Sequence, residues 1–330
     1  MSPASFRAFR IHNDDNGYRS GITDIGLDDL SPGEVVVKAA YSSVNFKDAL
    51  AGTGRGKILR QFPLNGGIDV AGHVIASTDP NFREGDAVLC TGSGLSETRD
   101  GGYSQVARLQ SQWTILLPTG LSLRESMILG TAGFTAALAL YRMRENRQTP
   151  DLGPLCVTGA TGGVGSLACA IFSQAGYEVH AVSGKADQHA YLRSLGATEI
   201  LGRDALQTTR PMESARFGGG LDNVGGPMLA SLLAQTSPYG NVASAGLAAT
   251  AELPITVMPF IIRGVSLLGV ASAGTALDIR QDIWRLLANE WKPKQLDAIC
   301  TREVTLDELP SVFEMMLAGG SLGRTVVRID

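Results

Sequence analysis

The sequence predicts an α/β fold in two lobes, a β-rich lobe followed by a doubly wound parallel sheet. The chain has 330 residues, which exceeds the roughly 100–200 residues of an ordinary domain. Residues 1–120 contain short apolar runs separated by turns, whereas strand-like and helix-like patterns alternate after residue 121. The 40 glycines suit the tight strand–helix connections of an α/β fold.

The first lobe is predicted to consist of antiparallel strands and irregular loops. Its clearest strand is Val35–Ala39, which follows the turn Ser31–Glu34 and is rich in β-branched residues. Further strands of this lobe are predicted at 72–77, 87–89, 103–109 and 113–117. The tail 325–329 also has a strand pattern, and we expect it to return to the first lobe.

The second lobe shows the alternation of strands and helices that is typical of βαβ units. Its strands are predicted at 154–158, 177–183, 199–201, 221–224, 241–245 and 266–270, and its helices at 126–144, 164–174 and 188–195. Gly176 and Gly196 follow two of these helices and can end them as C′ residues. A complete dinucleotide-binding sheet needs about six strands. A further helix is predicted at 278–291, and the apolar segment 265–270 is expected at the edge of the sheet.

Composition and charge exclude several classes of protein. The net charge is −4 and the Lys and Arg residues are dispersed, so we expect no nucleic-acid and no membrane partner. No CxxC pair occurs, and the cysteine spacing suggests neither a disulfide framework nor a metal site. The cysteines are Cys90, Cys156, Cys169 and Cys300. The N-terminus lacks the apolar core of a signal peptide, and no apolar run reaches the roughly 18 residues of a membrane span. The expected compartment is the cytoplasm.

The strongest local motif is the glycine-rich run Leu155–Gly165, LCVTGATGGVG. It follows a predicted strand and opens a predicted helix, which is the setting of a dinucleotide-binding loop. Ala160 stands at the first glycine position of an AxGxxG pattern. Gly162 would let the backbone approach a pyrophosphate, Gly165 would let helix and strand pack closely, and the helix N-terminus would face the negative charge. The alternative is an ordinary tight strand–helix turn.

The residues after the next strand favour NADPH over NADH. An NAD site usually carries an acidic residue there, which binds the ribose 2′-hydroxyl and would repel a 2′-phosphate. Here the strand ends in Ser183, Gly184 and Lys185, and Arg203 after the third strand can add a second cation. Taken alone, Lys185 is as well explained as a solvated lysine at a helix start. Because the acidic residue is missing, NADPH is the predicted cofactor.

Several motifs resemble the medium-chain dehydrogenase/reductase superfamily over essentially the whole chain. Ser42–Asp48, SSVNFKD, is similar to the SSxNYKD segment of its quinone-reductase branch, and Gly67–Gly72 is similar to the GxDxAG of that branch. Alcohol dehydrogenases of the superfamily carry GHExxG there, and their zinc ligands are absent from this sequence. More specifically, residues 53–60, 130–136 and 256–263 resemble the acryloyl-CoA reductase subgroup, which reduces acryloyl-CoA to propionyl-CoA with NADPH.

This resemblance implies a fold, an assembly and a set of cofactor contacts. Residues 1–122, rejoined by 273–330, would form a GroES-like catalytic domain, and residues 123–272 a Rossmann NADPH-binding domain. Family members commonly pair the edge strand with its twofold mate, so a homodimer is expected. Carried over by position, the cofactor contacts would be Phe46, Gly162, Gly163, Val164, Gly165, Ser183, Gly184, Lys185, Arg203, Leu247, Ile262 and Ser272.

Reduction of an enoyl thioester requires hydride at the β-carbon and a proton at the α-carbon, with an enolate-like intermediate that hydrogen bonds stabilise. The candidate catalytic residues are Asn45, Phe46 and Lys47. Asn45 could orient the carbonyl, and Lys47, Tyr41 or water could supply the proton. Phe46 stands where the family commonly has Tyr, so its ring can pack near the nicotinamide but can donate no proton. No metal is expected, whereas alcohol dehydrogenases commonly use zinc to stabilise an alkoxide.

A basic loop could bind the phosphate groups of coenzyme A. The predicted substrate-binding residues are Arg55, Lys57 and Arg60, and Arg324 is a weaker candidate. The alternative is a solvated loop with no ligand.

Three functions are compatible with the sequence, each with a small-molecule partner. The leading one is a zinc-independent, NADPH-dependent reductase of an activated C=C bond, with acryloyl-CoA as substrate. The first alternative is an NADPH quinone or enone oxidoreductase, which has no need of the basic loop. The second is a non-catalytic NADPH-binding protein, against which the segment Asn45–Asp48 argues.

Overall fold

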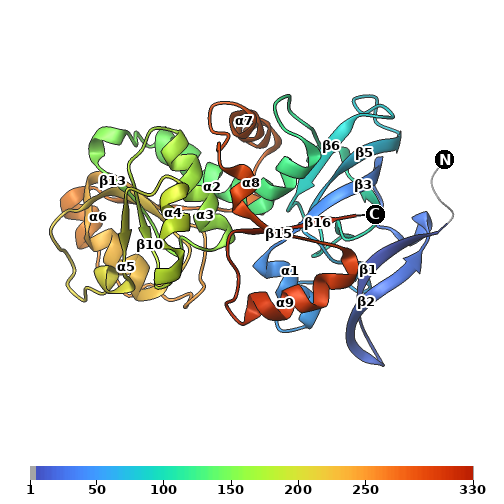
Figure 1. The fold of residues 1–330 in the computed structure, drawn as a ribbon, viewed down its shortest axis with the longest axis horizontal. Coiled ribbons are helices and arrows are strands. Elements are labelled where there is room, and N and C mark those ends of the chain that lie inside the picture. Colours follow the sequence, from blue (N-terminus) through green and yellow to red (C-terminus); the bar gives the residue numbers. More distant parts are fainter. Residues whose placement is uncertain (1–4, 330) are drawn as a thin grey trace. The chain divides into compact units, whose positions relative to one another are not determined.

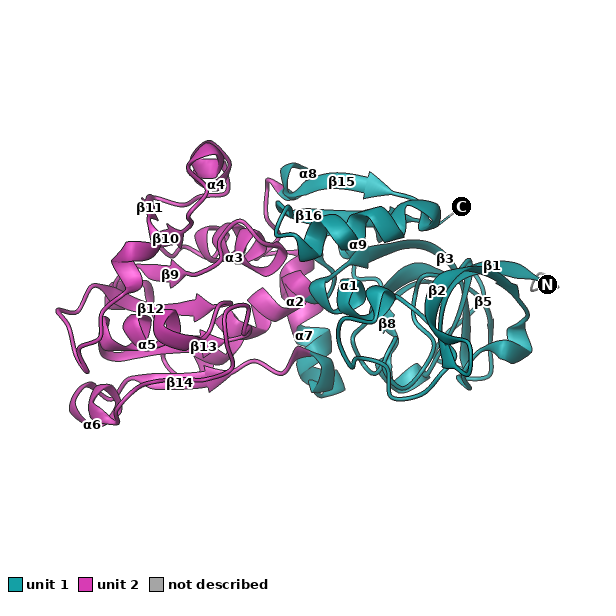
Figure 2. Ribbon diagram, turned by 90° about the horizontal axis from the view of Figure 1, so that it is seen from below, with its two compact units in different colours: residues 1–131, 273–282, 296–330 teal, residues 132–272, 283–295 magenta. Residues whose placement is uncertain are grey.

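The computed structural model describes residues 5–329, which form two compact units (Figure 2). Unit 1 comprises the residues up to 131 together with 273–282 and those from 296 on, and unit 2 comprises 132–272 and 283–295. This division differs from the expected one, because residues 123–131 group with unit 1 and residues 283–295 with unit 2. Two of the crossings between units fall inside helices, α2 (Leu123–Glu145) and α7 (Leu277–Ala288).

Unit 1 is built around a seven-stranded sheet of order β15-β16-β3-β5-β6-β8, with β7 paired to β3. Its strands are β3 (Val35–Val44), β5 (Asp69–Ser77), β6 (Ala87–Thr91), β7 (Val106–Leu109), β8 (Ile115–Leu116), β15 (Cys300–Val304) and β16 (Arg324–Arg328). The last strand, β16, runs antiparallel to β3, with Thr325 opposite Val44 (Figure 1). The predicted return of the C-terminal tail to the first lobe is thus confirmed.

A smaller sheet of unit 1 has the order β2-β1-β4. Its strands are β1 (Phe6–Asp14), β2 (Gly17–Ile25) and β4 (Leu64–Asn65). The β1–β2 hairpin turns at Asp15 and Asn16, and Gly17, the first residue of β2, accepts the positive φ found there, +84°. This hairpin was not predicted from the sequence, since β2 is mostly exposed and polar and shows no apolar alternation.

Helix α1 (Phe46–Thr53) packs against α9 (Leu309–Leu317) in unit 1. The contact is close, because a Cβ atom on Gly52 would lie 2.2 Å from Cε2 of Phe313. Phe313 meets the core residue Phe9 edge to face, with ring centroids 5.7 Å apart. Helix α1, which carries two of the candidate catalytic residues, is therefore fixed to the core of unit 1. The remaining helix of this unit is α8 (Leu296–Ile299), and short 3-10 turns lie at Leu27–Asp29, Ser111–Trp113 and Leu306–Glu308.

Unit 2 contains a six-stranded parallel sheet of order β11-β10-β9-β12-β13-β14. Its strands are β9 (Leu155–Val157), β10 (Val179–Val182), β11 (Glu199–Leu201), β12 (Phe217–Asp222), β13 (Thr236–Ser244) and β14 (Ser266–Gly269). This is the doubly wound order of a dinucleotide-binding sheet. Both the predicted number of strands and the predicted edge position of the segment 265–270 are confirmed.

Helices accompany the strands of this sheet. They are α3 (Gly163–Gln174), α4 (His189–Ser194), α5 (Gly226–Ala234) and α6 (Met258–Arg263), with 3-10 turns at Pro150–Leu152, Ala186–Gln188, Arg203–Leu206 and Ser272–Gly274. The predicted strand at 221–224 was wrong in its bounds, since β12 begins at Phe217 and ends at Asp222. Its start is rich in glycine, which lowers β-propensity. Close packing explains those glycines: a Cβ atom on Gly220 would lie 2.3 Å from the Cys156 carbonyl oxygen.

Candidate functional site

The glycine-rich loop of unit 2 connects β9 to α3, as predicted. Gly159 has φ +59°, and Gly162 is the N-cap of α3. A Cβ atom on Gly165 would lie 2.3 Å from the Gly159 carbonyl oxygen and 2.7 Å from Cα of Ala160, so only glycine lets α3 pack this closely on the loop. The first turn of α3 contains no acidic residue, and the N–H groups of a helix N-terminus attract anions. The loop therefore has the form of a pyrophosphate cradle.

A hydrogen-bonded cluster at the ends of β9 and β12 supports this loop. Thr158 Oγ1 donates to Asp222 Oδ1 at 2.7 Å, and the N–H of Gly225 donates to Asp222 Oδ2 at 2.6 Å. Asn223 Nδ2 donates to the Thr158 carbonyl oxygen at 2.8 Å. Burial raises the pKa of the Asp222 carboxyl group. This cluster could not be predicted from the sequence, because Thr158 is more than sixty residues from its partners Asp222 and Asn223.

The residues predicted to bind a 2′-phosphate lie together at the ends of β10 and β11. Ser183 Oγ accepts a hydrogen bond from the Lys185 N–H at 3.0 Å. A Cβ atom on Gly184 would lie 2.9 Å from Nε of Arg203, so the Arg203 side chain rests against the Gly184 backbone. Ser183, Lys185 and Arg203 therefore lie at the strand ends where an NAD site would carry an acid.

In unit 1, the candidate catalytic segment forms the start of α1. Asn45 is the N-cap, and the Asp48 carboxylate accepts hydrogen bonds from the N–H groups of Asn45 at 2.8 Å and of Ile68 at 2.9 Å. Burial, reinforced by the negative charge of Asp69, raises the pKa of Asp48 to about 7. The side chain of Phe46, in the first turn, is 57% exposed. An apolar ring is thus presented to solvent by a rigidly capped helix.

A buried polar network lies behind this helix start. Asp69 Oδ2 accepts hydrogen bonds from Ser43 Oγ at 2.6 Å and from Asn45 Nδ2 at 2.8 Å, and Asp69 Oδ1 accepts one from Thr131 Oγ1 at 2.6 Å. Arg324 Nη2 lies 4.0 Å from Asp69 Oδ2 and donates to Ser43 Oγ at 2.7 Å. Arg324 is only 3% exposed. The prediction that Arg324 binds phosphate was wrong, because its guanidinium group is buried and bonds to residues inside unit 1.

The same contacts decide what Asn45 and Lys47 can do. The Asn45 amide donates to Asp69, and its oxygen accepts a hydrogen bond from Arg324 Nη1 at 3.1 Å. Lys47 Nζ forms an ion pair with Glu97. Both side chains are therefore engaged within unit 1, and Phe46 is the member of this segment whose side chain is presented outward.

The predicted phosphate-binding residues lie on the loop that follows α1. Arg55, Lys57 and Arg60 are all exposed. Arg55 Nη2 pairs with the Glu314 carboxylate on α9 at 2.8 Å, an exposed contact that is worth little and can be exchanged for a ligand. The N–H of Arg60 donates to the Glu97 carbonyl oxygen at 2.8 Å. The structure thus leaves three exposed cations on one loop.

Metal-binding groups do not gather in the part of the chain that is described. Within residues 5–329, no three or more His, Cys, Asp or Glu side chains are grouped so that they could hold a metal ion. Burial raises the pKa of the Cys90 and Cys169 thiols to about 12 and that of Cys156 still further. These thiols are neutral interior groups and not thiolates poised for metal or catalysis.

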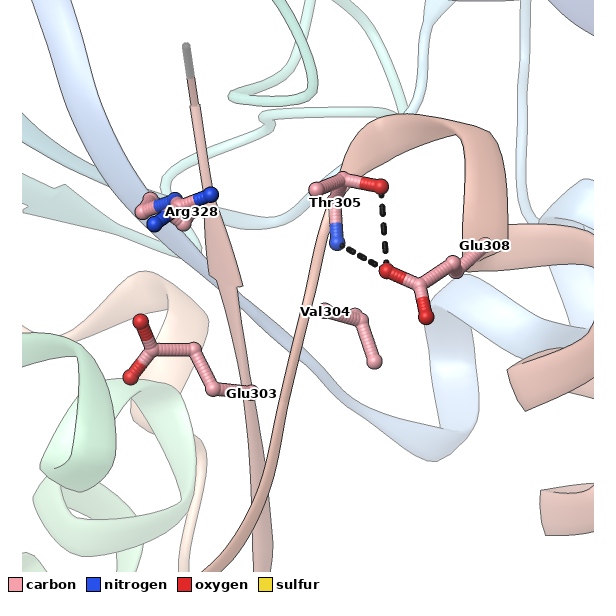
Figure 3. Close-up of a pocket in the computed structure, with 5 residues that line it drawn as sticks. All are labelled: Glu303, Val304, Thr305, Glu308 and Arg328. Atoms are coloured by element: carbon pink, nitrogen blue, oxygen red, sulfur yellow. Dashed lines mark hydrogen bonds between the residues drawn. The ribbon is translucent and has the colours of Figure 1, made fainter.

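Unit 1 has a small surface pocket, and two of the acidic side chains that line it already bond to other residues of the protein (Figure 3). It is lined by Glu303, Val304, Thr305, Glu308 and Arg328. Glu308 accepts hydrogen bonds from the N–H and Oγ1 of Thr305, at 2.8 and 3.0 Å, and so caps the helical turn that follows. Glu303 pairs with Arg124 Nε at 2.8 Å. These contacts stabilise the local fold, so the pocket is not a candidate ligand site.

Comparison with known proteins covers both units. Residues 31–119 match the family of the alcohol dehydrogenase GroES-like domain, and residues 163–289 match that of zinc-binding dehydrogenases. The chain is 42% identical over 329 residues to the acrylyl-CoA reductase AcuI of Ruegeria pomeroyi, covering 98% of this chain and 99% of that protein. It is 41% identical over 326 residues to a Bacillus subtilis protein named as a quinone oxidoreductase, YhfP, covering 98% and 99%.

Solved structures show the same fold along the whole chain. The yhdH oxidoreductase of Salmonella enterica, crystallised with NADP, is 43% identical with a TM-score of 0.95, covering 98% of this chain and all of that one. The yhfP protein of Bacillus subtilis, crystallised with NAD, is 41% identical with a TM-score of 0.95, covering 99% and 100%. Among the described residues, no helix is both long and apolar enough to cross a bilayer.

Proposed function

The chain belongs to the medium-chain dehydrogenase/reductase family, with a GroES-like unit and a Rossmann unit, and from this premise we propose that it reduces acryloyl-CoA to propionyl-CoA with NADPH. The observation that carries the proposal is the end of β10, where Ser183, Gly184 and Lys185 stand in place of the acidic residue of an NAD site and Arg203 rests against Gly184. Such a strand end would favour the 2′-phosphorylated dinucleotide over the unphosphorylated one. The substrate is proposed from the end-to-end similarity to an acrylyl-CoA reductase.

NADPH fits the residues of unit 2. The loop Gly162–Gly165 and the N-terminus of α3 would hold the pyrophosphate, and Ser183, Lys185 and Arg203 the 2′-phosphate. Relatives of nearly equal similarity were crystallised with NADP and with NAD, so the choice of cofactor depends on these side chains. Leu247, Ile262 and Ser272 remain proposed contacts; the side chains of Leu247 and Ile262 are 66% and 60% exposed.

The reaction places different demands on the residues of α1. When bound, NADPH supplies the hydride that goes to the β-carbon of the enoyl thioester. The exposed ring of Phe46 offers an apolar face on which a planar group can pack. Asn45 and Lys47 position this helix start through Asp69, Arg324 and Glu97. Because the side chains of Asn45 and Lys47 are already engaged, the proposed proton source for the α-carbon is water or Tyr41.

Zinc, which the name of one matching family implies, does not fit the donor set of the described residues. The cysteines and histidines lie apart, and no cluster of three ligands forms within residues 5–329. Zinc bound in protein sites takes about four ligands, including Cys thiolates and His nitrogens. We therefore assign no step to a metal, and the proposed reductase is zinc-independent.

The phosphate groups of coenzyme A are assigned to the loop after α1. Arg55, Lys57 and Arg60 supply three exposed positive charges there, and arginine binds phosphate through paired hydrogen bonds. Arg55 would exchange its exposed partner Glu314 for the ligand. A simple quinone has no group that needs this loop.

The deciding experiment follows NADPH oxidation with acryloyl-CoA and, separately, with a simple quinone, and repeats both with NADH. The proposal expects the highest kcat/KM for acryloyl-CoA with NADPH. A quinone preferred by orders of magnitude would make the chain a quinone oxidoreductase, the function for which YhfP is named. Tight NADPH binding with no turnover of any activated alkene would indicate a non-catalytic role.

A further inference from the structure

Arg99, in the loop that follows β6, is an arginine without a counter-ion. Its Nε atom is buried and has no hydrogen-bond partner. The residue is only partly exposed. Within the described residues 5–329, no carboxylate forms an ion pair with its guanidinium group. A buried donor of a charged group that lacks a partner is costly, and proteins rarely keep one without a reason.

The acidic residues nearest to Arg99 in sequence are committed elsewhere. Glu97 pairs with Lys47 on α1. Asp100 Oδ1 lies 3.3 Å from Arg10 Nη1, and its other oxygen accepts hydrogen bonds from the N–H and Oγ of Ser31 at 2.7 and 2.8 Å. The positive charge of Arg99 is therefore left uncompensated, although two carboxylates lie within two residues of it.

A second unsatisfied group lies on the same turn. The hydroxyl of Ser96 is fully buried and has no hydrogen-bond partner among the described residues. The N–H of Ser96 donates to the Arg99 carbonyl oxygen at 2.8 Å, so both residues belong to one tight turn. Arg99 also acts together with Arg280 on Cys90: burial raises the pKa of that thiol to about 12, while both positive charges oppose the rise.

The turn is connected to residues of the proposed substrate site. Glu97 binds Lys47 at the start of α1 through its side chain. Its carbonyl oxygen accepts a hydrogen bond from the Arg60 N–H at 2.8 Å, and the Thr98 carbonyl oxygen accepts one from Gln61 Nε2 at 2.7 Å. The loop that contains Arg99 is therefore bonded both to Lys47 in the candidate catalytic segment and to the proposed phosphate-binding loop.

We propose that Arg99, together with the hydroxyl of Ser96, binds an anionic oxygen of the substrate. The identity of that substrate rests on the proposed function. An acyl-CoA offers two kinds of such oxygen: the thioester oxygen, which gains negative charge when hydride reaches the β-carbon, and the phosphate oxygens of coenzyme A. Either would complete the hydrogen bonds that the empty protein leaves unmade.

The test uses Arg99→Met, which keeps much of the apolar length of the side chain and removes the charge, with Arg99→Lys as the conservative variant. Arg19→Met, at an exposed arginine paired with Asp14 in the β1–β2 hairpin, is the matched control. With acryloyl-CoA, kcat/KM of Arg99→Met should fall at least tenfold, Arg99→Lys should recover part of the loss, and Arg19→Met should match the wild type. The Tm of Arg99→Met without substrate should equal or exceed that of the wild type, because an unpaired buried donor has been removed.

A substrate without phosphate distinguishes the two oxygens. With the acryloyl thioester of N-acetylcysteamine, a loss of similar size assigns Arg99 to the thioester oxygen. A loss confined to acryloyl-CoA assigns it to phosphate. If kcat/KM of Arg99→Met stays within twofold of the wild type for both substrates, the proposal is overturned; it is also overturned if the Tm drops by several degrees, which would mark a structural role.

A binding probe separates failure of this proposal from failure of the proposed function. If the wild type does not reduce acryloyl-CoA, thermal shifts with inorganic phosphate and with acetate still report on the site, because a ligand that binds only the folded protein raises its Tm. At least one of these anions should raise the Tm of the wild type and of Arg19→Met more than that of Arg99→Met. Equal shifts in all three proteins would exclude an anion site at Arg99.

Discussion

At the scale of single residues, the start of α1 depends on a carboxyl group that holds its proton near neutral pH. Asp48 accepts hydrogen bonds from two backbone N–H groups, which favour its charged form. Burial and the charge of Asp69 outweigh them and raise its pKa to about 7. An acid of the unfolded chain titrates near its ordinary value of 3.8, so folding takes up a proton between these two pH values.

Replacing Asp48 should therefore change how stability depends on pH. The stabilisation from the bound proton is full below about pH 4, declines as the pH rises, and is lost above about pH 7. Between pH 5 and 7.5, the free energy of unfolding should fall by about 2–3 kcal/mol more in the wild type than in Asp48→Asn. Denaturant titrations at several pH values measure this, with the exposed Asp24→Asn as control. Parallel curves for the wild type and Asp48→Asn would show that Asp48 does not take up a proton on folding.

Lys185 should discriminate between the two nicotinamide cofactors. Its backbone N–H donates to Ser183 Oγ, and Arg203 rests against the neighbouring Gly184, at the strand end where a 2′-phosphate is expected. Lys185→Ala should raise KM for NADPH by about tenfold, about 1.4 kcal/mol, and should leave KM for NADH nearly unchanged. Initial-rate kinetics with both cofactors, alongside the exposed Lys38→Ala, measure the effect. Equal changes for NADPH and NADH would remove Lys185 from the phosphate site.

At the scale of elements, the distance between α3 and the preceding loop is set by one glycine. A Cβ atom on Gly165 would lie 2.3 Å from the Gly159 carbonyl oxygen, a separation that backbone atoms can relieve only by moving. Gly165→Ala should cost about 1–3 kcal/mol of stability by overpacking and should weaken NADPH binding, since α3 would shift from the pyrophosphate. Gly21→Ala, whose Cβ would meet nothing within 4 Å, is the control. Calorimetry and NADPH titration test both effects, and a Gly165→Ala protein that binds NADPH normally would contradict the predicted packing.

Elements with a clear period and clear ends could be predicted from the sequence. Helix α3 was placed within one residue, and β11 was placed at its observed bounds, because apolar periodicity and flanking glycines agreed there. Helix α1 was missed, since it has only eight residues and its formation depends on the cap by Asn45 and Asp48 and on packing against Phe313. Short elements of this kind are determined by tertiary contacts and not by local pattern.

The residues of the candidate site also fall into those that local motifs predict and those that only the fold brings together. The cofactor loop and the cationic residues after β10 follow from local motifs, and the structure brings Ser183, Lys185 and Arg203 together. The network around Asp69 could not be read from the sequence, because Arg324 lies 281 positions from Ser43, to which it donates. Arg324 therefore looked like a surface cation beside a glycine, whereas the fold turns it inward.

At the scale of the whole molecule, the open edge of the sheet in unit 2 predicts that a second chain pairs with it. Strand β14 pairs with β13 on one side and ends the sheet on the other. Helix α6, which precedes it, exposes apolar side chains: Ile261 is 76% exposed, and Val257 at its N-cap is 63% exposed. Edge strands and exposed apolar groups of this kind are normally covered in soluble proteins. A second copy of the chain can cover both at once through a twofold axis.

We therefore expect a homodimer of about twice the 34.7 kDa chain mass, formed through β14 and α6. A single charged substitution at this interface should dissociate the dimer into monomers. In Ile261→Glu, a carboxylate would have to be buried at the interface without a partner, which costs far more than leaving it in water. Light scattering coupled to size exclusion should then give the mass of a monomer, whereas Leu116→Glu, at an exposed leucine of unit 1, should remain dimeric. The far-UV spectrum of Ile261→Glu should match that of the wild type, because Ile261 makes little contact within its own chain. A wild-type chain that is monomeric at micromolar concentration would show that β14 is tolerated as a free edge, and the apolar side chains of α6 would then need another explanation.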